Sequence, residues 1–183
     1  MTMWWIIGGV VVIIAIIFFT YYNRFARLIN QIENSFSQID VQLKKRADLV
    51  PNLVASVKGY MKHEKGIIDS VTEARKSLVG ARDFAGKVRA GDQLQAAIGR
   101  LFAIAENYPN LKANENFLQL QTEMSAIEDK IAYARQYYND GIMSYNTITT
   151  TIPGTWFASL YGFKKKDYLH IPDKERAPIK VDF

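Results

Sequence analysis

The first 23 residues carry no charged side chain, so all 23 basic and all 18 acidic residues lie after them. Residues 4–22 form 19 consecutive uncharged positions, most of them isoleucine, valine or aromatic. A helix of this length spans about 28 Å, which is close to the hydrocarbon thickness of a bilayer, roughly 30 Å. The sequence therefore predicts a membrane-spanning helix at the N-terminus, followed by a polar body.

Aromatic side chains mark both ends of the apolar run, with Trp4 and Trp5 at one end and Tyr21 and Tyr22 at the other. Tryptophan and tyrosine favour the two membrane–water interfaces. A cleaved signal peptide would need a basic stretch before the run and a small-residue cleavage site after it, and the sequence has neither. We therefore expect residues 1–23 to be a retained transmembrane anchor.

Basic residues follow the anchor, first Arg24 and Arg27 and then residues 44–46. Because lysine and arginine accumulate on the cytoplasmic side of a span, we expect the N-terminus outside and the body in the cytoplasm. The predicted location is the cell inner membrane, with a single pass. The chain has no cysteine, which agrees with a cytoplasmic body and excludes a disulfide framework or a thiolate metal site.

Apolar residues after the anchor recur every seven positions, which is typical of packed helices. The first frame runs over residues 29–78, and 13 of its 15 positions are apolar or aromatic. The second frame runs over residues 117–152, and none of its 11 positions holds a charged residue. A shorter helix between them opens near Asp92, a residue type that caps helix N-termini. We therefore predict an all-α fold in which residues 24–163 form a long antiparallel up-and-down bundle of four helices.

Glycine and proline indicate where the helices end. Residues 80–91 contain three glycines and residues 107–110 contain a proline, so both are predicted connections. Pro51 leaves two alternatives: it kinks one long helix, or Asp48 caps a new helix with the proline in its first turn. The second alternative gives four helices of roughly 25, 27, 18 and 39 residues. Residues 164–183 are expected to form an extended basic tail.

Three strings contain polar residues at positions where a helix surface exposed to water would not require them. They are residues 45–54, 106–114, and 134–139 together with 145–146. In this order and behind an N-terminal anchor, they resemble the LemA family over residues 20–163. The resemblance implies a membrane-anchored, cytoplasmic helical bundle without an established enzymatic activity. The family includes a relative involved in building magnetosome membranes, and members often neighbour the gene of an HtpX-like membrane protease.

We expect the polar residues of these strings to have a structural role, in ion pairs and hydrogen bonds between the helices. Arg46 occupies a core-facing position and therefore needs a carboxylate partner, although a ligand-binding arginine is an alternative. Asp48, Glu106 and Glu128 are the candidate partners. Four residues of the third string are expected to form a buried hydrogen-bond network along the last helix. The predicted structural residues are Arg46, Asp48, Pro51, Asn52, Glu106, Asn107, Tyr108 and Pro109, with Arg135, Tyr138, Asn139 and Asn146 in the network.

The sequence lacks the constellations that carry enzymatic chemistry. His63 and Glu64 resemble the start of a zinc-protease motif, but Ile67 stands where the second histidine ligand would be. A serine triad, a glycine-rich phosphate loop and paired carboxylates are also missing. We therefore predict no catalytic, metal or cofactor site and no enzyme. The net charge is +5, but basic and acidic residues are mixed along the helices, which argues against a nucleic-acid partner.

The segment at residues 151–166 is unusually rich in large apolar residues followed by lysine. It is either a hydrophobic cap on the end of the bundle or a second contact with the inner leaflet of the membrane. The residues of this predicted contact are Trp156, Phe157, Leu160, Tyr161, Phe163, Lys164, Lys165 and Lys166.

These features together predict a single-pass, membrane-anchored helical scaffold that self-associates as a homo-oligomer and organises or remodels the bilayer. The alternative is an adaptor or regulatory partner of an HtpX-like membrane protease or of another membrane protein.

Overall fold

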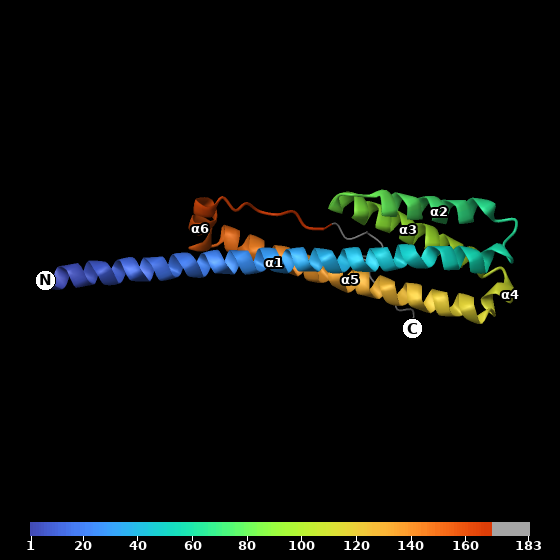
Figure 1. Cartoon of the computed structure of the whole chain (residues 1–183), viewed down its shortest axis with the longest axis horizontal. Helices are drawn as coiled ribbons and strands as arrows, with labels where there is room; N and C mark the ends of the chain where they lie inside the picture. Colours follow the sequence, from blue (N-terminus) through green and yellow to red (C-terminus); the bar gives the residue numbers. More distant parts are fainter. Residues whose placement is uncertain (170–183) are drawn as a thin grey trace, which may run out of the picture. The chain divides into compact units, whose positions relative to one another are not determined.

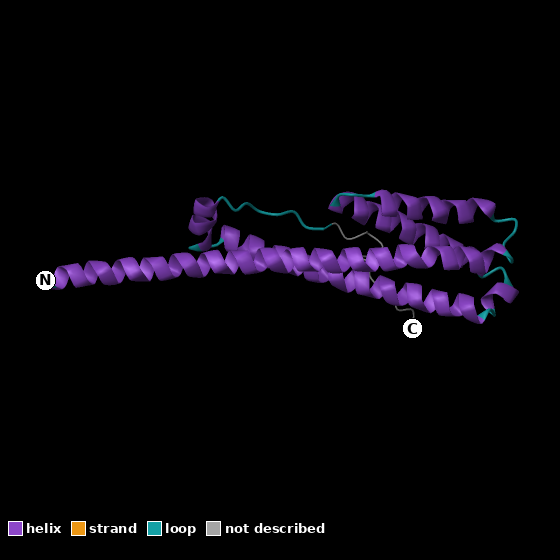
Figure 2. Cartoon of the chain, in the orientation of Figure 1, coloured by secondary structure: helices purple, strands orange, loops and turns teal. Residues whose placement is uncertain are grey.

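The computed structural model describes residues 1–169, and this part of the chain is helical without any strand (Figure 2). The predicted all-α fold is thereby confirmed. Within these residues one helix, the first, is long and apolar enough to cross a membrane, and none of its most apolar 18-residue stretch is buried. The helices are α1 (Thr2–Lys58), α2 (Lys65–Gly80), α3 (Phe84–Ala105), α4 (Pro109–Lys112), α5 (Glu115–Thr150) and α6 (Gly154–Tyr161), labelled in Figure 1.

The chain divides into two compact units, and α1 and α5 each contribute to both. One unit is Ser37–Tyr133, and the other combines Met1–Phe36 with the C-terminal part from Ala134.

In the unit Ser37–Tyr133, α2 and α3 form a hairpin and pack along each other (Figure 1). The second part of α1 and the first part of α5 complete a helical core. The apolar residues that recur along each helix are the buried ones, because each helix turns one apolar face toward the core of this unit. Its fully buried side chains include Leu43, Val50, Leu53, Leu94, Leu101 and Leu111.

Pro51 does not end the first helix, which continues as a regular α-helix to Lys58. The alternative with a new helix capped by Asp48 is therefore wrong, and α1 is 57 residues long. The chain turns instead at residues 59–64, between α1 and α2. The apolar frame hid this turn because the frame positions Val71 and Leu78 are buried on α2 as well.

The predicted connection at residues 80–91 is much shorter in the structure, because α3 begins at Phe84. Asp83, not Asp92, caps this helix: its extended backbone lets the side chain accept a hydrogen bond from the Gly86 amide at 3.1 Å. Gly91 serves close packing instead of a turn, since a Cβ there would lie 2.6 Å from Leu43 Cδ2.

The other unit has a small, aromatic-rich core between the first part of α1, the second part of α5, and α6. Phe25, Ile142 and Tyr145 are almost fully buried there. Ala158 of α6 is 2% exposed, so the short helix belongs to this core. Residues 163–169 follow α6 without regular secondary structure.

Candidate functional site

The residues predicted to flank the membrane lie on the surface of α1. Trp4 and Trp5 are 76% and 83% exposed, and Arg24 and Arg27 are exposed two and five residues beyond the other end of the run. Tyr22 is also exposed, whereas Tyr21 is half-buried. The exposed apolar side chains before residue 20 leave α1 with the surface that a lipid-facing helix needs.

Helix α6 is held against α1 by a cluster of aromatic rings. Phe157 stacks on Tyr21 with 4.7 Å between ring centroids and 15° between ring planes. Tyr161 meets Phe18 edge to face at 5.0 Å, and its hydroxyl donates a hydrogen bond to the Phe18 carbonyl at 2.7 Å. Such pairs contribute beyond their buried area, so they fix α6 beside the end of the apolar run.

The predicted second membrane contact divides into an inward and an outward set. Phe157, Tyr161 and Phe163 pack against the core of this unit. Trp156 and Leu160 are 64% and 67% exposed, and their spacing of four residues puts them on one face of α6. The three lysines are all exposed, and the ammonium group of Lys166 also lies 5.7 Å from the centre of the Tyr145 ring.

Asn139 and Asn146 bind the backbone of the segment that follows α6. The Asn146 amide donates to the Lys166 carbonyl at 2.8 Å and accepts from the Lys166 amide at 2.9 Å. Asn139 makes the same pair with Leu169, at 3.1 and 2.8 Å. The two asparagines therefore form a clamp on residues 166–169, a role that sequence reasoning missed because their partners are main-chain atoms.

The other members of the predicted network lie on the same helix. Arg135 is buried, with 4% of its surface exposed. Tyr138 is half-buried and packs against the aromatic core, and burial raises its pKa above the ordinary value. Burial likewise raises the pKa of Tyr145 above the ordinary value.

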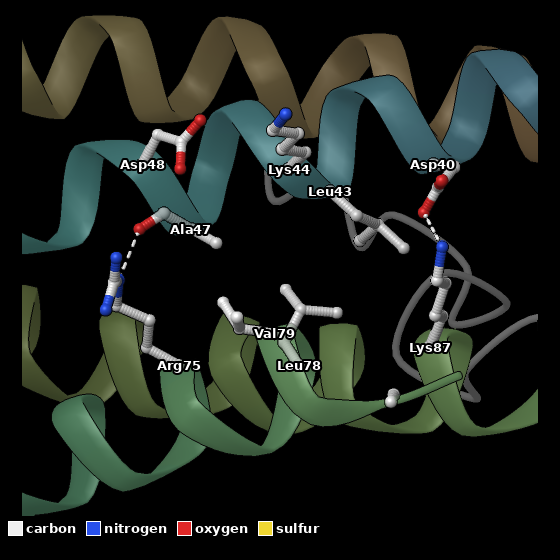
Figure 3. A pocket seen from close by; sticks show the side chains of 10 residues that line it. Asp40, Leu43, Lys44, Ala47, Asp48, Arg75, Leu78, Val79 and Lys87 are labelled. Atoms are coloured by element: carbon white, nitrogen blue, oxygen red, sulfur yellow. Dashed lines mark hydrogen bonds and ion pairs between the residues drawn. The ribbon is translucent and has the colours of Figure 1, made fainter. Parts of the chain in front are cut away.

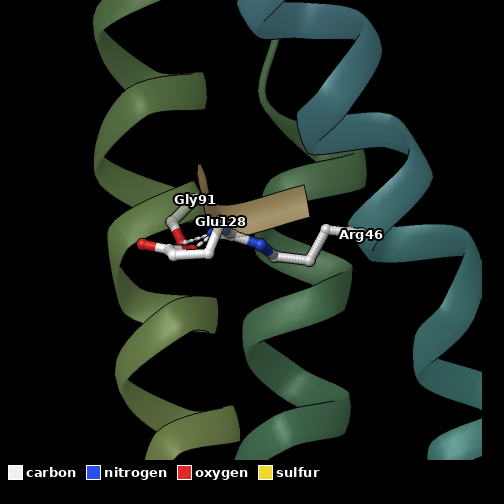
Figure 4. A network of polar contacts seen from close by, with 3 residues as sticks. All are labelled: Arg46, Gly91 and Glu128. Atoms are coloured by element: carbon white, nitrogen blue, oxygen red, sulfur yellow. Dashed lines mark hydrogen bonds and ion pairs between the residues drawn. The ribbon is translucent and has the colours of Figure 1, made fainter. Parts of the chain in front are cut away.

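Arg46 is a buried charge in the unit Ser37–Tyr133, with 2% of its surface exposed (Figure 4). Its guanidinium pairs with the Glu128 carboxylate of α5 and donates to the Gly91 carbonyl of α3 at 3.4 Å. One arginine thus joins α1, α3 and α5. Of the other candidate partners, Asp48 is exposed and Glu106 pairs with Lys112 at the surface.

Arg75 explains how α1 continues through Pro51. Proline has no N–H group, so the carbonyl four residues earlier, that of Ala47, loses its helical donor. The Arg75 Nε of α2 donates to this carbonyl at 2.8 Å (Figure 3). This contact lies at one end of a pocket of about 320 Å³ that is lined by α1, α2 and α3. At the other end Lys87 pairs with Asp40, and the two side chains are 2.6 Å apart. Two of the pocket's cations are therefore engaged in contacts between helices.

The string at residues 106–114 ties the α1–α2 turn to the connection before α5. The Tyr108 hydroxyl donates to Glu64 at 3.1 Å, and desolvation together with this hydrogen bond raises the pKa of Tyr108. Asn114 donates to the Tyr60 hydroxyl at 3.3 Å and accepts from the Phe117 amide at 3.1 Å, which caps α5. Pro109 opens α4, where a missing N–H costs nothing. Asn52 and Asn107 are exposed.

No group of three or more histidine, cysteine or acidic side chains placed to hold a metal ion occurs within residues 1–169. Among the buried polar side chains of this part, Arg46 pairs with another helix, and Ser35 and Asn146 bind backbone groups. Over its described residues, the protein is therefore all-helical, with one N-terminal helix able to span a membrane.

The comparison with protein families agrees with this class. The sequence model of the LemA family matches residues 35–183, and the chain belongs to the LemA family.

The individual relatives share between 25% and 31% of their aligned residues with this chain. Magnetosome protein MamQ of Magnetospirillum gryphiswaldense is 26% identical, over 86% of this chain and 68% of that protein. Magnetosome protein MamQ 2 of Paramagnetospirillum magneticum is 25% identical over the same shares. Protein LemA of Metamycoplasma hominis is 31% identical over 68% of this chain and 58% of that protein.

Proposed function

We propose that the protein is a membrane-anchored scaffold that touches the bilayer twice, self-associates, and so organises or shapes the membrane. Helix α1 supplies the anchor, and the outward face of α6 supplies the second contact. The observation that carries the proposal is the position of α6, which aromatic contacts hold beside Phe18 and Tyr21 while Trp156 and Leu160 stay exposed.

The exposed residues suit the boundary between water and lipid. A tryptophan ring is apolar but carries an N–H donor, so it favours the headgroup region. Lys164 and Lys165 are exposed just after α6, and each basic residue near an anionic surface adds about 1 kcal/mol of attraction. In this proposal, α6 lies along the surface of the cytoplasmic leaflet, where α1 emerges from the membrane.

The proposed topology places the body in the cytoplasm and the N-terminus outside, in the cell inner membrane, because Arg24 and Arg27 follow the span. In this proposal, the chain has no catalytic centre and acts by binding the bilayer and other copies of itself. Similarity to two proteins named after the magnetosome supports a structural role.

Trp156 itself reports the contact. Trp4→Phe and Trp5→Phe leave it as the only one of the three tryptophans in the chain. In vesicles containing anionic lipid, we expect its fluorescence to be quenched by lipids brominated near the headgroup and to be protected from iodide in the water.

A matched control moves the tryptophan away from α6. Trp156→Phe combined with Tyr133→Trp, in the same background, places it at a position that is 72% exposed on α5. This control should be quenched by iodide and not by brominated lipid. If Trp156 behaves like the control, α6 does not touch the bilayer and the proposed second contact is wrong.

A further inference from the structure

Residues 163–169 complete the core of their unit. The rings of Phe163 and Phe25 lie 4.9 Å apart, and Leu169 is 8% exposed. The ammonium group of Lys166 lies over the Tyr145 ring. The segment thus contacts both α1 and α5, and we call it the strap.

The clamp recognises the strap by its backbone alone. Asn139 and Asn146 are seven residues apart, so they lie on one face of α5 and about 10.5 Å apart along its axis. Lys166 and Leu169 are three residues apart, which is about 10 Å in an extended chain. Each asparagine uses its donor and its acceptor on one residue of the strap. A strap from another copy would satisfy these four hydrogen bonds equally well.

The link between α6 and the clamped residues has the features of a hinge. Gly162 adopts a left-handed conformation, with φ of 74°, and nothing would lie within 4 Å of a Cβ there. Lys164 and Lys165 are exposed. A change of backbone direction at residues 162–165 would redirect the strap. It would break the hydrogen bond from the Phe163 amide to the Ala158 carbonyl of α6, but it would leave the contacts of Phe157 and Tyr161 with α1.

We propose that residues 163–169 exchange between neighbouring copies, so that the Asn139–Asn146 clamp of one copy binds the strap of the next. The exchanged strap makes the same contacts as the chain's own strap, so the interaction energies nearly cancel, as in domain swapping. Anchoring confines copies to one surface, and the raised effective concentration then favours exchange. This inference rests on the proposed self-associating scaffold and identifies its partner as a second copy.

Two full-length variants with complementary defects test the exchange. The clamp variant carries Asn139→Leu and Asn146→Leu and keeps its strap. The strap variant carries Lys166→Pro and Leu169→Pro, which remove the two donated N–H groups, and keeps its clamp. Only a mixture of the two offers an intact strap to an intact clamp in a different molecule.

The measurement is co-purification in mild detergent of two copies that carry different tags and are expressed together. We expect the mixed pair to be recovered several-fold better than either variant paired with itself. Equal recovery of the mixed and the self-pairs would overturn the exchange.

A conservative version guards against misfolding. Asn139→Asp and Asn146→Asp keep the side-chain size and the acceptor but lose the donor, and should give the same order of recoveries. The oligomeric mass of the wild-type chain distinguishes the two proposals. A multimer whose variants show no preference for the mixed pair disproves the exchange alone, whereas a monomer disproves self-association as well.

Discussion

Replacing Arg46 with alanine is expected to lower the free energy of unfolding by about 3–5 kcal/mol, the usual cost of removing one partner of a buried ion pair. The guanidinium is 2% exposed and holds together helices from three parts of the sequence, through Glu128 and the Gly91 carbonyl. Its removal leaves a partly buried carboxylate without its cation. Thermal and urea unfolding of the full chain in detergent, followed by circular dichroism, measures the loss.

Two further variants separate the cost of a stranded charge from the value of the pair. Arg46→Met combined with Glu128→Met should recover much of the loss, because both desolvated charges disappear together. Lys112→Ala breaks the Lys112–Glu106 pair, whose side chains are 58% and 56% exposed, and should cost less than about 1 kcal/mol. Unchanged unfolding of Arg46→Ala would contradict the structural role of Arg46 and favour a role in binding a ligand or partner.

Replacing Pro51 with alanine is expected to stabilise the protein, by up to about 3 kcal/mol, the difference between these residues inside a helix. The backbone at position 51 is already helical, and the proline side chain is exposed, so no packing is lost. Alanine restores an N–H group that can donate to the Ala47 carbonyl.

Arg75 provides the matching half of a double-mutant cycle. In the wild-type chain, Arg75→Met should cost about 1–2 kcal/mol, because the Ala47 carbonyl loses its donor. In the Pro51→Ala background the same change should cost much less, since the helix itself then supplies the donor. Equal costs in both backgrounds would mean that Arg75 does not compensate for the proline.

The apolar period predicted the helices well because burial acts on one face of each helix. The same period could not locate the turn at residues 59–64, because Val57 and Val71 are buried on either side of it and the frame fits both. The glycines of residues 80–91, in contrast, predicted a connection where the structure has the start of α3. At Gly91 the structure uses a missing side chain for close approach to Leu43, and a sequence pattern cannot distinguish this use from a turn.

The sequence indicated which polar residues make buried contacts, but it did not indicate their partners. The core-facing position of Arg46 indicated an ion pair, but the choice among three carboxylates depends on how the helices are rotated. The spacing of Asn139 and Asn146 was visible in the sequence. Their partners are backbone groups of the strap, which every residue type offers, so no side-chain pattern marked them.

The adaptor role remains the rival to the scaffold role, and the two differ in how many copies associate without another protein. The mass of the purified full chain in mild detergent therefore tests the central claim most directly. The scaffold proposal predicts homo-oligomers well above the 20.9 kDa of one chain after the detergent contribution is subtracted. A single chain at every protein concentration would contradict it and would favour a monomer that waits for a different membrane protein.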